Sequence, residues 1–284
     1  MVLVPNGTPG PTPVVRMMVL ETDEPHPKSK GRRGTYGEIL RRHFESAGAD
    51  HDPPLGVQTD TRFVVTDKGG KVPTYDELND FHAVLITGSM YDAHGSNEWI
   101  TQLVGLLTDV WRRRPDMRFS GVCFGHQILN RILGSTVAPA PSQDWELGHC
   151  RINLTATGQR LFQTNQPFVH LHQMHQDQVV EAPDPAASGG LLEARARVSV
   201  WGSSRHTKVQ GTYIPRRVFT TQAHLAFDER MVKREMEMRV KQGAIEDPEH
   251  VHRAAETAHL EHDGDLVAAA ILRFFHGDDD EIDA

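Results

Sequence analysis

Apolar runs alternate with segments of helical periodicity along the first half of the chain. Short apolar runs at 14–20, 62–66 and 81–90 have the β-branched content of buried strands. Segments 36–47 and 99–114 instead repeat their apolar residues every three or four positions, as amphipathic helices do. This alternation predicts an α/β fold built on a doubly wound, mainly parallel sheet.

The second half of the chain has a different pattern, with short apolar stretches separated by turns. These stretches predict an antiparallel group of strands at one edge of the same domain, and they lie at 151–155, 198–202, 208–214 and 217–221. Helices are expected at 228–244 and 251–276. The predicted fold class is therefore a three-layer α/β domain of flavodoxin-like type, with a mainly parallel sheet and a small antiparallel flank.

The two ends of the chain lack this patterning. Residues 1–13 are rich in proline and glycine and are expected to form a flexible leader. Residues 277–284 are mostly acidic and predict a frayed tail. Between them, residues 14–276 are expected to form one domain, and a chain of 284 residues is long enough to bury a hydrophobic core.

Charge and cysteine content narrow the classes of function. The net charge is −8, and the one basic cluster, at 28–33, is short and is interpreted as a solvated loop, so no nucleic-acid partner is expected. Two cysteines are too few for a disulfide framework, which favours free thiols in a reducing compartment. No apolar run approaches the roughly 20 residues of a membrane span, and the N-terminus lacks a targeting pattern. We therefore expect a cytoplasmic protein without a membrane partner.

The most informative stretch is Gly121-Val-Cys-Phe-Gly125, which follows an apolar run and continues into a helical pattern predicted to end at Gly134. A thiol between a strand end and a helix start occupies a cramped backbone conformation, and the small residues two positions away on either side permit it. The helix N-terminus is expected to lower the pKa of the Cys123 thiol and to supply N–H donors for an oxyanion. The alternative is a buried cysteine beside a tight turn.

A thiol nucleophile also needs a base, and His224 at the end of a predicted strand is the candidate. Taken alone, a histidine in such a place is more often structural. His170, His172 and His175 raise the alternative of a metal site, but no cysteine or carboxylate completes a ligand set, so no metal is expected. The second cysteine, Cys150, is interpreted as a core residue.

A family resemblance becomes specific at this point. The chain carries, in order, Ile86-Thr-Gly-Ser89, Gly121-Val-Cys-Phe-Gly-His-Gln127, Trp145-Glu-Leu-Gly148, His175-Gln-Asp177 and Gln222-Ala-His224. This order resembles the class I, or triad, glutamine amidotransferase domain over residues 14–276. It is most similar to stand-alone eukaryotic members related to GMP-synthetase amidotransferase domains and to γ-glutamyl peptidases.

The resemblance implies a role for each matching position. It makes Cys123 the nucleophile and His224 the base, and it places the oxyanion donors at Gly88 or Ser89 and at Phe124. It also places four side chains around the γ-glutamyl group: Gln127, His175, Asp177 and Glu146. A carboxylate such as Asp177 suits the α-ammonium of glutamine, whereas without the family pattern His175 and Asp177 would read as a polar surface turn.

One departure from the family concerns the third member of the triad. The family base is followed by Pro and then Glu, whereas Leu225 and Ala226 stand in those places here. Asp228 or Glu229 is the candidate replacement, and a Cys–His pair can react without its acid.

The sequence predicts a cofactor-free amidohydrolase that acts on glutamine or a γ-glutamyl compound through a γ-glutamyl thioester. Because no synthetase sequence follows within these residues, ammonia would pass to a separate synthase, or no transfer would occur. The alternative function is a catalytically inactive member that binds a ligand or a partner protein.

Overall fold

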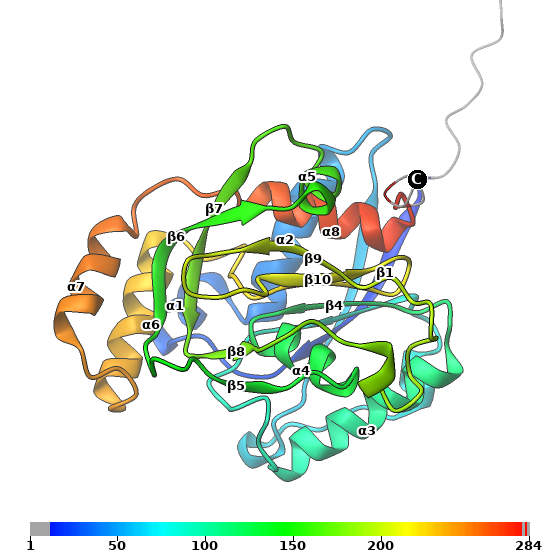
Figure 1. Ribbon diagram of the computed structural model, residues 1–284, viewed down its shortest axis with the longest axis horizontal. Helices are drawn as coiled ribbons and strands as arrows, with labels where there is room; N and C mark the ends of the chain where they lie inside the picture. The colour runs from blue at the N-terminus through cyan, green and yellow to red at the C-terminus, as the bar shows by residue number, and fades with distance from the viewer. Residues whose placement is uncertain (1–11, 280–281, 283–284) are drawn as a thin grey trace, which may run out of the picture.

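The computed structural model describes residues 12–279 and 282, so most of the predicted leader and part of the predicted acidic tail lie outside the described residues. Its centre is a nine-stranded sheet of order β2-β1-β3-β4-β11-β10-β9-β6-β7 (Figure 1). The strands are, in that order, Gly56–Phe63, Val14–Glu21, Ala83–Ile86, Arg118–Val122, Val218–Thr221, Gly211–Ile214, Ser199–Ser203, Glu146–Leu154 and Phe168–His175. A second, two-stranded sheet pairs β5 (Val137–Pro139) with β8 (Asp177–Val179).

The sheet divides into a parallel and an antiparallel part. Strands β2, β1, β3, β4 and β11 run parallel, and β10, β9, β6 and β7 continue the same sheet with antiparallel pairing. The predicted α/β class with a mainly parallel sheet is confirmed. The antiparallel flank supplies four of the nine strands and contains β7, whose end reaches the candidate site. The stretch at 217–221, expected in this flank, is instead β11, which also pairs in parallel with β4.

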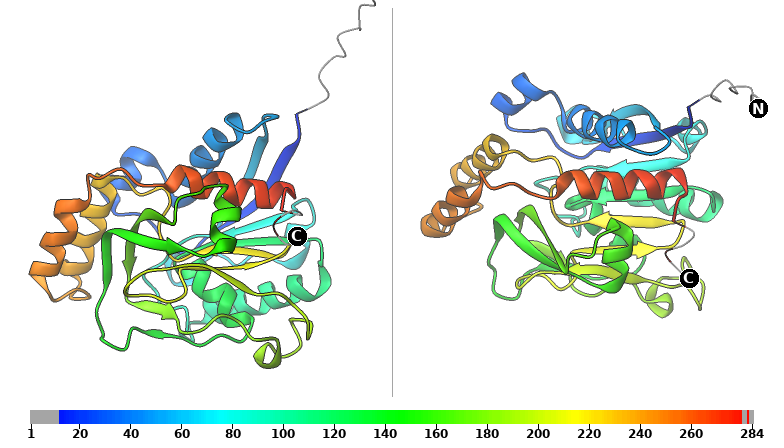
Figure 2. Two further views of the ribbon diagram at one scale, coloured as in Figure 1. Left: turned by 45° about the horizontal axis from the view of Figure 1, so that its top comes forward. Right: turned by 90° about the horizontal axis from the view of Figure 1, so that it is seen from above.

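Helices cover both faces of the parallel part, as Figure 2 shows. On one face, α2 (Tyr36–Ala49) and α8 (Gly264–His276) pack against the side chains that point that way, among them Met17 and Leu85. On the other, α3 (Glu98–Arg113) and α4 (Phe124–Ile132) pack against Met18 and Val84. Consecutive residues of one strand thus enter opposite cores, which explains why these strands read as uninterrupted apolar runs.

A separate pair of helices, α6 (Glu229–Lys241) and α7 (Pro248–Thr257), lies at one end of the molecule beside β6 and β7 (Figure 1). A third apolar cluster joins them to the sheet; it includes Leu147, Met174, Phe227, Met231 and Ile245. We call residues 228–263, which contain both helices, the excursion. It follows β11 along the chain and ends where α8 begins.

Several predicted boundaries are wrong. The basic cluster at 28–33 lies in a helix, α1 (Pro27–Arg33), whose first turn is capped by the His26 side chain. Strand β2 begins at Gly56 and pairs along its whole length with β1. A short helix, α5 (Ala156–Phe162), was not expected.

The single helix expected over 251–276 is two, α7 and α8. The chain between them is fastened to β7, because the Asp263 N–H donates to the His170 carbonyl (2.8 Å) and the Asp263 carboxylate accepts from the His170 N–H (2.7 Å). This pairing fixes the backbone at Asp263 and gives α8 a start of its own at Gly264.

Asp279, in the segment predicted as a frayed tail, is held firmly. Its side chain is 1% exposed and accepts hydrogen bonds from Arg118 (2.8 Å), the Tyr213 hydroxyl (2.9 Å) and the Arg216 N–H (2.9 Å). These contacts tie the end of α8 to the start of β4. Within the described residues, no helix is both long and apolar enough to cross a bilayer.

Strand β3 and helix α4 approach so closely at Gly125 that a side chain has no room: a Cβ there would lie 2.2 Å from the Ile86 carbonyl oxygen. We expect Gly125→Ala to lower the free energy of unfolding by about 1–3 kcal/mol, because the backbone must shift. The matched control is Gly105→Ala, in the middle of α3, where a Cβ meets no atom within 4 Å. That change should raise stability by roughly 0.5–1 kcal/mol. Urea unfolding of both variants measures the difference, and equal effects would contradict the close approach.

Candidate active site

Cys123 occupies a strained position between β4 and α4. Its backbone has φ 53° and ψ −105°, which a non-glycine residue rarely adopts. The neighbours make this turn possible, because a Cβ at Gly121 would lie 2.2 Å from the Gly125 carbonyl carbon. The strand, tight turn and helix therefore present the Cys123 side chain at the carboxyl edge of the sheet, where α/β proteins bind ligands.

His224 reaches the same place from the neighbouring strand. It lies three residues beyond β11, which pairs directly with β4, and its N–H donates to the His172 carbonyl on β7 (2.9 Å). A Cβ built on Gly88 would lie 3.4 Å from the Cys123 Cβ and 3.0 Å from the His224 Cε1, so both side chains converge on this glycine. Two residues far apart in the sequence are thus neighbours. Among the described contacts, no hydrogen bond joins them.

An open pocket of about 200 Å³ lies in front of Cys123. It is smaller than the roughly 300–1,000 Å³ that drug-sized ligands occupy, so it suits a group the size of an amino acid. Predicted site residues in its wall are Ser89, Cys123, Gln127, His175 and Asp177.

His224 does not line this pocket. It faces a separate apolar cavity of about 20 Å³, and the wall there includes Tyr36, Ala226 and Phe227. Gly88 also belongs to that wall. The Phe227 ring stacks on the imidazole with 4.0 Å between ring centres, which leaves His224 held mainly by apolar contact.

The predicted replacement for the missing acid is wrong. Asp228 caps α6 by accepting from the Met231 N–H (2.8 Å), and it also accepts from Arg33 (2.7 Å). Glu229 is exposed and paired with Lys233. Neither carboxylate orients His224, and the Nε2 of that imidazole is buried without a hydrogen-bond partner among the described residues.

Gln127 and Asp177 lie together in the pocket wall. The Gln127 amide donates to the Asp177 carbonyl (2.8 Å) and to the Gln222 side chain (3.2 Å). The Asp177 carboxylate is 3.1 Å from the His94 Nδ1. Burial raises the pKa of Asp177, and the nearby Asp92 adds to this, while the charge of His94 opposes it. A cation that binds here would relieve the cost of burying this carboxylate.

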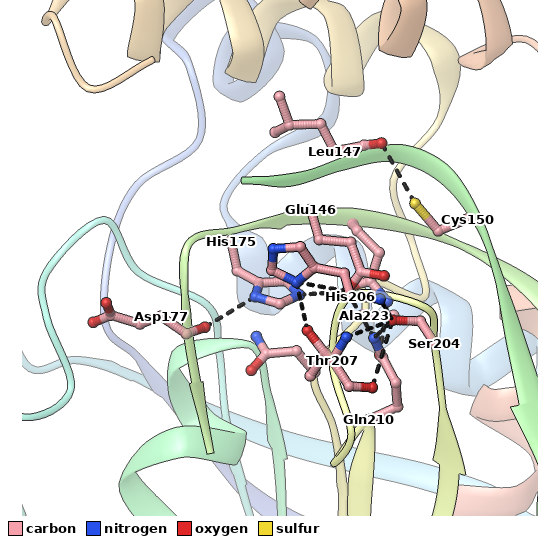
Figure 3. A network of polar contacts seen from close by, with 12 residues as sticks. Glu146, Leu147, Cys150, His175, Asp177, Ser204, His206, Thr207, Gln210 and Ala223 are labelled. Carbon is pink, nitrogen blue, oxygen red and sulfur yellow. Dashed lines mark hydrogen bonds and ion pairs between the residues drawn. The ribbon is translucent and has the colours of Figure 1, made fainter. Parts of the chain in front are cut away.

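Glu146 and His175 are directly opposite in the register of β6 and β7, and they bond to each other (Figure 3). The His175 Nε2 lies 3.0 Å from a Glu146 oxygen, and its Nδ1 lies 2.9 Å from the Asp177 carbonyl. The same Glu146 oxygen accepts from Gln210 (2.8 Å). Both ring nitrogens of His175 are therefore in use, and Glu146 lines a neighbouring pocket rather than the one at Cys123. Glu146, expected to contact substrate, therefore lies behind the wall of the Cys123 pocket, whereas His175 is part of that wall.

Two of the residues expected to supply oxyanion donors, Gly88 and Ser89, lie in the loop after β3, and Ser89 lines the Cys123 pocket. The Thr22 hydroxyl is 3.0 Å from the carbonyl oxygens of both Thr87 and Gly88, and the Ser89 hydroxyl donates to the Thr22 carbonyl (2.8 Å). These bonds fix the loop after β3, while the Ser89 N–H has no partner in the described part of the chain. The Phe124 N–H is close enough to the Cys123 sulfur to lower the pKa of the thiol.

Electrostatics at the pair differ from the sequence prediction. Burial raises the pKa of the Cys123 thiol to about 11, although the positive charge of Arg239 and the Phe124 N–H act in the opposite direction. Burial, together with Arg239, holds the pKa of His224 well below its ordinary value. The helix N-terminus therefore does not produce a low thiol pKa here, because desolvation of the anion outweighs it. The resting pair is a neutral thiol and a neutral imidazole.

Sequence reasoning missed several residues of the pocket. Arg239 lines it and is buried, and Asp92 lines it as well. Gln222, fully buried, bonds Gln127 and lies against the thiol. For Gln222 the available signal was its place in the Gln222-Ala-His224 motif. For Arg239 there was none, because it belongs to a predicted helix whose charged residues were expected to face solvent. In the described part of the chain, no group of three or more His, Cys, Asp or Glu is arranged to hold a metal ion.

Comparison with known proteins places this geometry in context. Residues 74–236 match the family described as glutamine amidotransferase class-I. A glutamine amidotransferase-like protein of Schizosaccharomyces pombe is 24% identical over 256 residues, which cover 90% of this chain and 96% of the relative. Gamma-glutamyl peptidase 5 of Arabidopsis thaliana is 32% identical over 157 residues, or 53% of this chain and 57% of the relative. A glutamine amidotransferase from Thermotoga maritima shares the fold, with a TM-score of 0.59 at 18% identity over 92% of this chain and 98% of that one.

The raised pKa of Cys123 predicts how its alkylation depends on pH. Only the thiolate reacts, so the rate with iodoacetamide should rise about tenfold per pH unit from pH 7 to 9.5. The measurement uses a Cys150→Ser background, because Cys150 is a second free thiol and is partly exposed. Partial burial raises the pKa of Cys150 to about 12. Cys123→Ser in the same background is the control for labelling elsewhere. A rate that levels off near pH 7 would contradict the neutral thiol.

Glu146 should make stability depend on pH. Burial acts to raise its pKa, but the hydrogen bond and charge of His175 outweigh burial and leave the pKa below the ordinary value. Its stabilisation is therefore present above the ordinary carboxyl pKa and is lost as the pH falls through the lowered one. Glu146→Gln should lower the free energy of unfolding by about 1–3 kcal/mol at pH 7 and by progressively less below about pH 4.

Urea unfolding across this pH range tests the Glu146 prediction. The exposed Glu181→Gln is the control and should stay within about 0.5 kcal/mol of the parent protein. A loss in Glu146→Gln that is the same at pH 7 and pH 3.5 would show that the carboxylate charge contributes nothing.

Proposed function

Because the chain belongs to the class-I glutamine amidotransferase family, we propose that it is a cysteine amidohydrolase that cleaves the γ-carboxamide of glutamine or of a γ-glutamyl compound. The observation that carries this proposal is the convergence of Cys123 and His224 on Gly88, with Cys123 facing an open pocket. A nucleophile and a base held side by side at the carboxyl edge of the sheet are the minimum requirement for acyl transfer.

In the first half of the proposed reaction, the Cys123 sulfur attacks the γ-carbonyl carbon and the thiol proton passes to His224. The N–H groups of Phe124 and of Ser89, or of Gly88, stabilise the resulting oxyanion. The C–N bond then breaks, and His224 returns its proton to the leaving nitrogen. The products of this half are ammonia or an amine and a γ-glutamyl thioester on Cys123.

Hydrolysis completes the cycle. A water molecule gives one proton to His224 and attacks the thioester, the C–S bond breaks, and Cys123 recovers its proton as glutamate leaves. Because the resting pair is neutral, His224 takes the thiol proton as the attack occurs rather than before it. In this scheme Gln127 and Asp177 contact the γ-glutamyl group, while Glu146 and His175 hold the wall that carries Asp177.

The fate of the nitrogen separates two versions of the activity. Members of the family act on glutamine-type substrates, and a separate synthase would use the ammonia if glutamine is the donor here. If the donor is a γ-glutamyl peptide or conjugate, the amine is the product and no transfer partner is needed. Both cysteines are free, which is compatible with the reducing, cytoplasmic location that we propose.

A catalytically inactive binding protein is the second candidate function. Three observations favour it: Ala226 stands in the place of the family acid, desolvation raises the pKa of the thiol, and no hydrogen bond joins Cys123 to His224 among the described contacts. In that case the pocket would hold its ligand without breaking a bond.

Product release distinguishes the two functions. Glutamate release is measured from glutamine and from γ-glutamyl conjugates, together with the ammonia or amine. We expect Cys123→Ala to reduce the rate by about a thousandfold or more, since it removes the nucleophile. Cys150→Ala is the matched control and should retain the parent rate. Equal background release from the parent and Cys123→Ala would favour the binding protein.

The missing acid gives a second test. We expect Ala226→Glu to raise kcat by about tenfold or more, because a carboxylate beside the imidazole fixes its orientation and stabilises its charged form. Ala226→Gln controls for the added bulk, since the cavity at this position is only about 20 Å³. If the two variants have the same rate, orientation of His224 is not limiting.

A further inference from the structure

Arg239 is a buried arginine in the wall of the Cys123 pocket. It lies on α6, within the excursion, and is 6% exposed. Its Nη1 donates to the Glu235 carboxylate (3.0 Å) and to the Glu235 carbonyl (3.1 Å). Among the described contacts, its Nε and Nη2 carry no hydrogen bond. A guanidinium with unused donors at a pocket wall is a ready partner for an anion.

Glu235 fixes this guanidinium in place. The carboxylate is completely buried, and its second oxygen accepts from the His26 N–H (2.8 Å) ahead of α1. Because both oxygens are committed, Glu235 holds only one edge of Arg239 and leaves the other edge available. Exposed arginine and glutamate pairs one helical turn apart are common and weak, but this pair is shielded from water on the inner side of α6.

The pocket carries charges of both signs. Asp177 and Asp92 are in its wall, as is Arg239, and Cys123 opens into the same space. The charges of both Arg239 and Asp177 act on the pKa of the Cys123 thiol, the first lowering it and the second raising it. Among the described residues, the wall thus carries one cation and two anions, and Cys123 is close enough to Arg239 and Asp177 to be influenced by both.

We propose that Arg239 binds the α-carboxylate of the γ-glutamyl donor, so that the pocket selects donors in which this carboxylate is free. The inference rests on the proposed function and adds a specificity-determining residue to it. A γ-glutamyl group has an ammonium and a carboxylate on one carbon, and the pocket offers Asp177 for the first and Arg239 for the second. Glu235 is then a positioning residue.

The proposal predicts a preference that can be measured without changing the protein. L-γ-glutamyl-p-nitroanilide and its α-methyl ester present the same scissile amide, but the ester lacks the carboxylate charge. The parent protein should cleave the ester with a kcat/KM about 10–100-fold lower, as expected for loss of a charge-assisted contact. Most of the loss should appear in KM, because the contact is made before the chemical step.

The variants test whether Arg239 is the source of this preference. Arg239→Gln alone leaves the Glu235 charge buried and unpaired, so the decisive variant is the double substitution Glu235→Gln with Arg239→Gln, checked by thermal unfolding. It should cleave the free acid no faster than the ester, which brings the ratio of the two kcat/KM values close to one. The ratio is the readout, because the charge of Arg239 also lowers the pKa of the Cys123 thiol and its loss slows both reactions. A purely structural role would lower both rates together and keep the ratio.

The outcomes separate this inference from the proposed function. If the parent protein cleaves both compounds equally well, the role of Arg239 is wrong while the amidohydrolase stands. If it cleaves neither, the proposed function fails, and protection of Cys123 from iodoacetamide becomes the readout. L-glutamate should then protect at a concentration about 10–100-fold lower than its α-methyl ester. Equal protection by the two would overturn the inference.

Discussion

The structure depends on the close approach of backbone segments around Cys123. Gly88, Gly121 and Gly125 lie where added side chains would press on the imidazole, on α4 and on β3, respectively. This closeness lets Cys123, with its φ of 53°, occupy the turn between β4 and α4. It also brings the side chain of His224 against Gly88, which the Cys123 side chain faces as well. The proximity of Cys123 and His224 is thus a consequence of backbone packing, and no hydrogen bond between them is needed to explain it.

The fold could be predicted because its signals are local. Strands whose successive residues enter opposite cores read as continuous apolar runs, and the helices between them show a clear period. Boundaries failed where a tertiary contact decides them. The separation of α7 from α8 depends on pairing between Asp263 and His170, and α1 begins at a histidine that caps it, so neither is visible in hydrophobicity. The antiparallel strands were recognised singly, but their continuity with the parallel sheet depends on pairing between distant segments.

The candidate site could be predicted only in part. Cys123 and Gln127 belong to a motif whose spacing reflects the turn between β4 and α4, and His224 was found from its place at the end of a predicted strand. Burial, in contrast, changes what each group does. It raises the pKa of Cys123 against the effect of the helix N-terminus. It also shields Glu235 and Arg239, whose spacing in the sequence is typical of a surface ion pair, so that Arg239 is held in a fixed position at the pocket. The resemblance assigned Glu146 and His175 to the substrate, but their bond to each other depends on register across two strands, which cannot be read from one strand at a time.

The excursion has its two ends fastened to a single strand. The His224 N–H, just before the excursion, donates to the His172 carbonyl, and the Asp263 N–H, at its end, donates to the His170 carbonyl. The two acceptors are two residues apart on β7. The backbone of the sheet is thus fixed at both ends of the excursion, whose own side chains pack on Leu147 and Met174. With the roles proposed for Cys123 and Arg239, chemistry and donor selection are encoded in separate segments of the chain, and exchange of residues 228–263 between homologues is a route to altered donor choice.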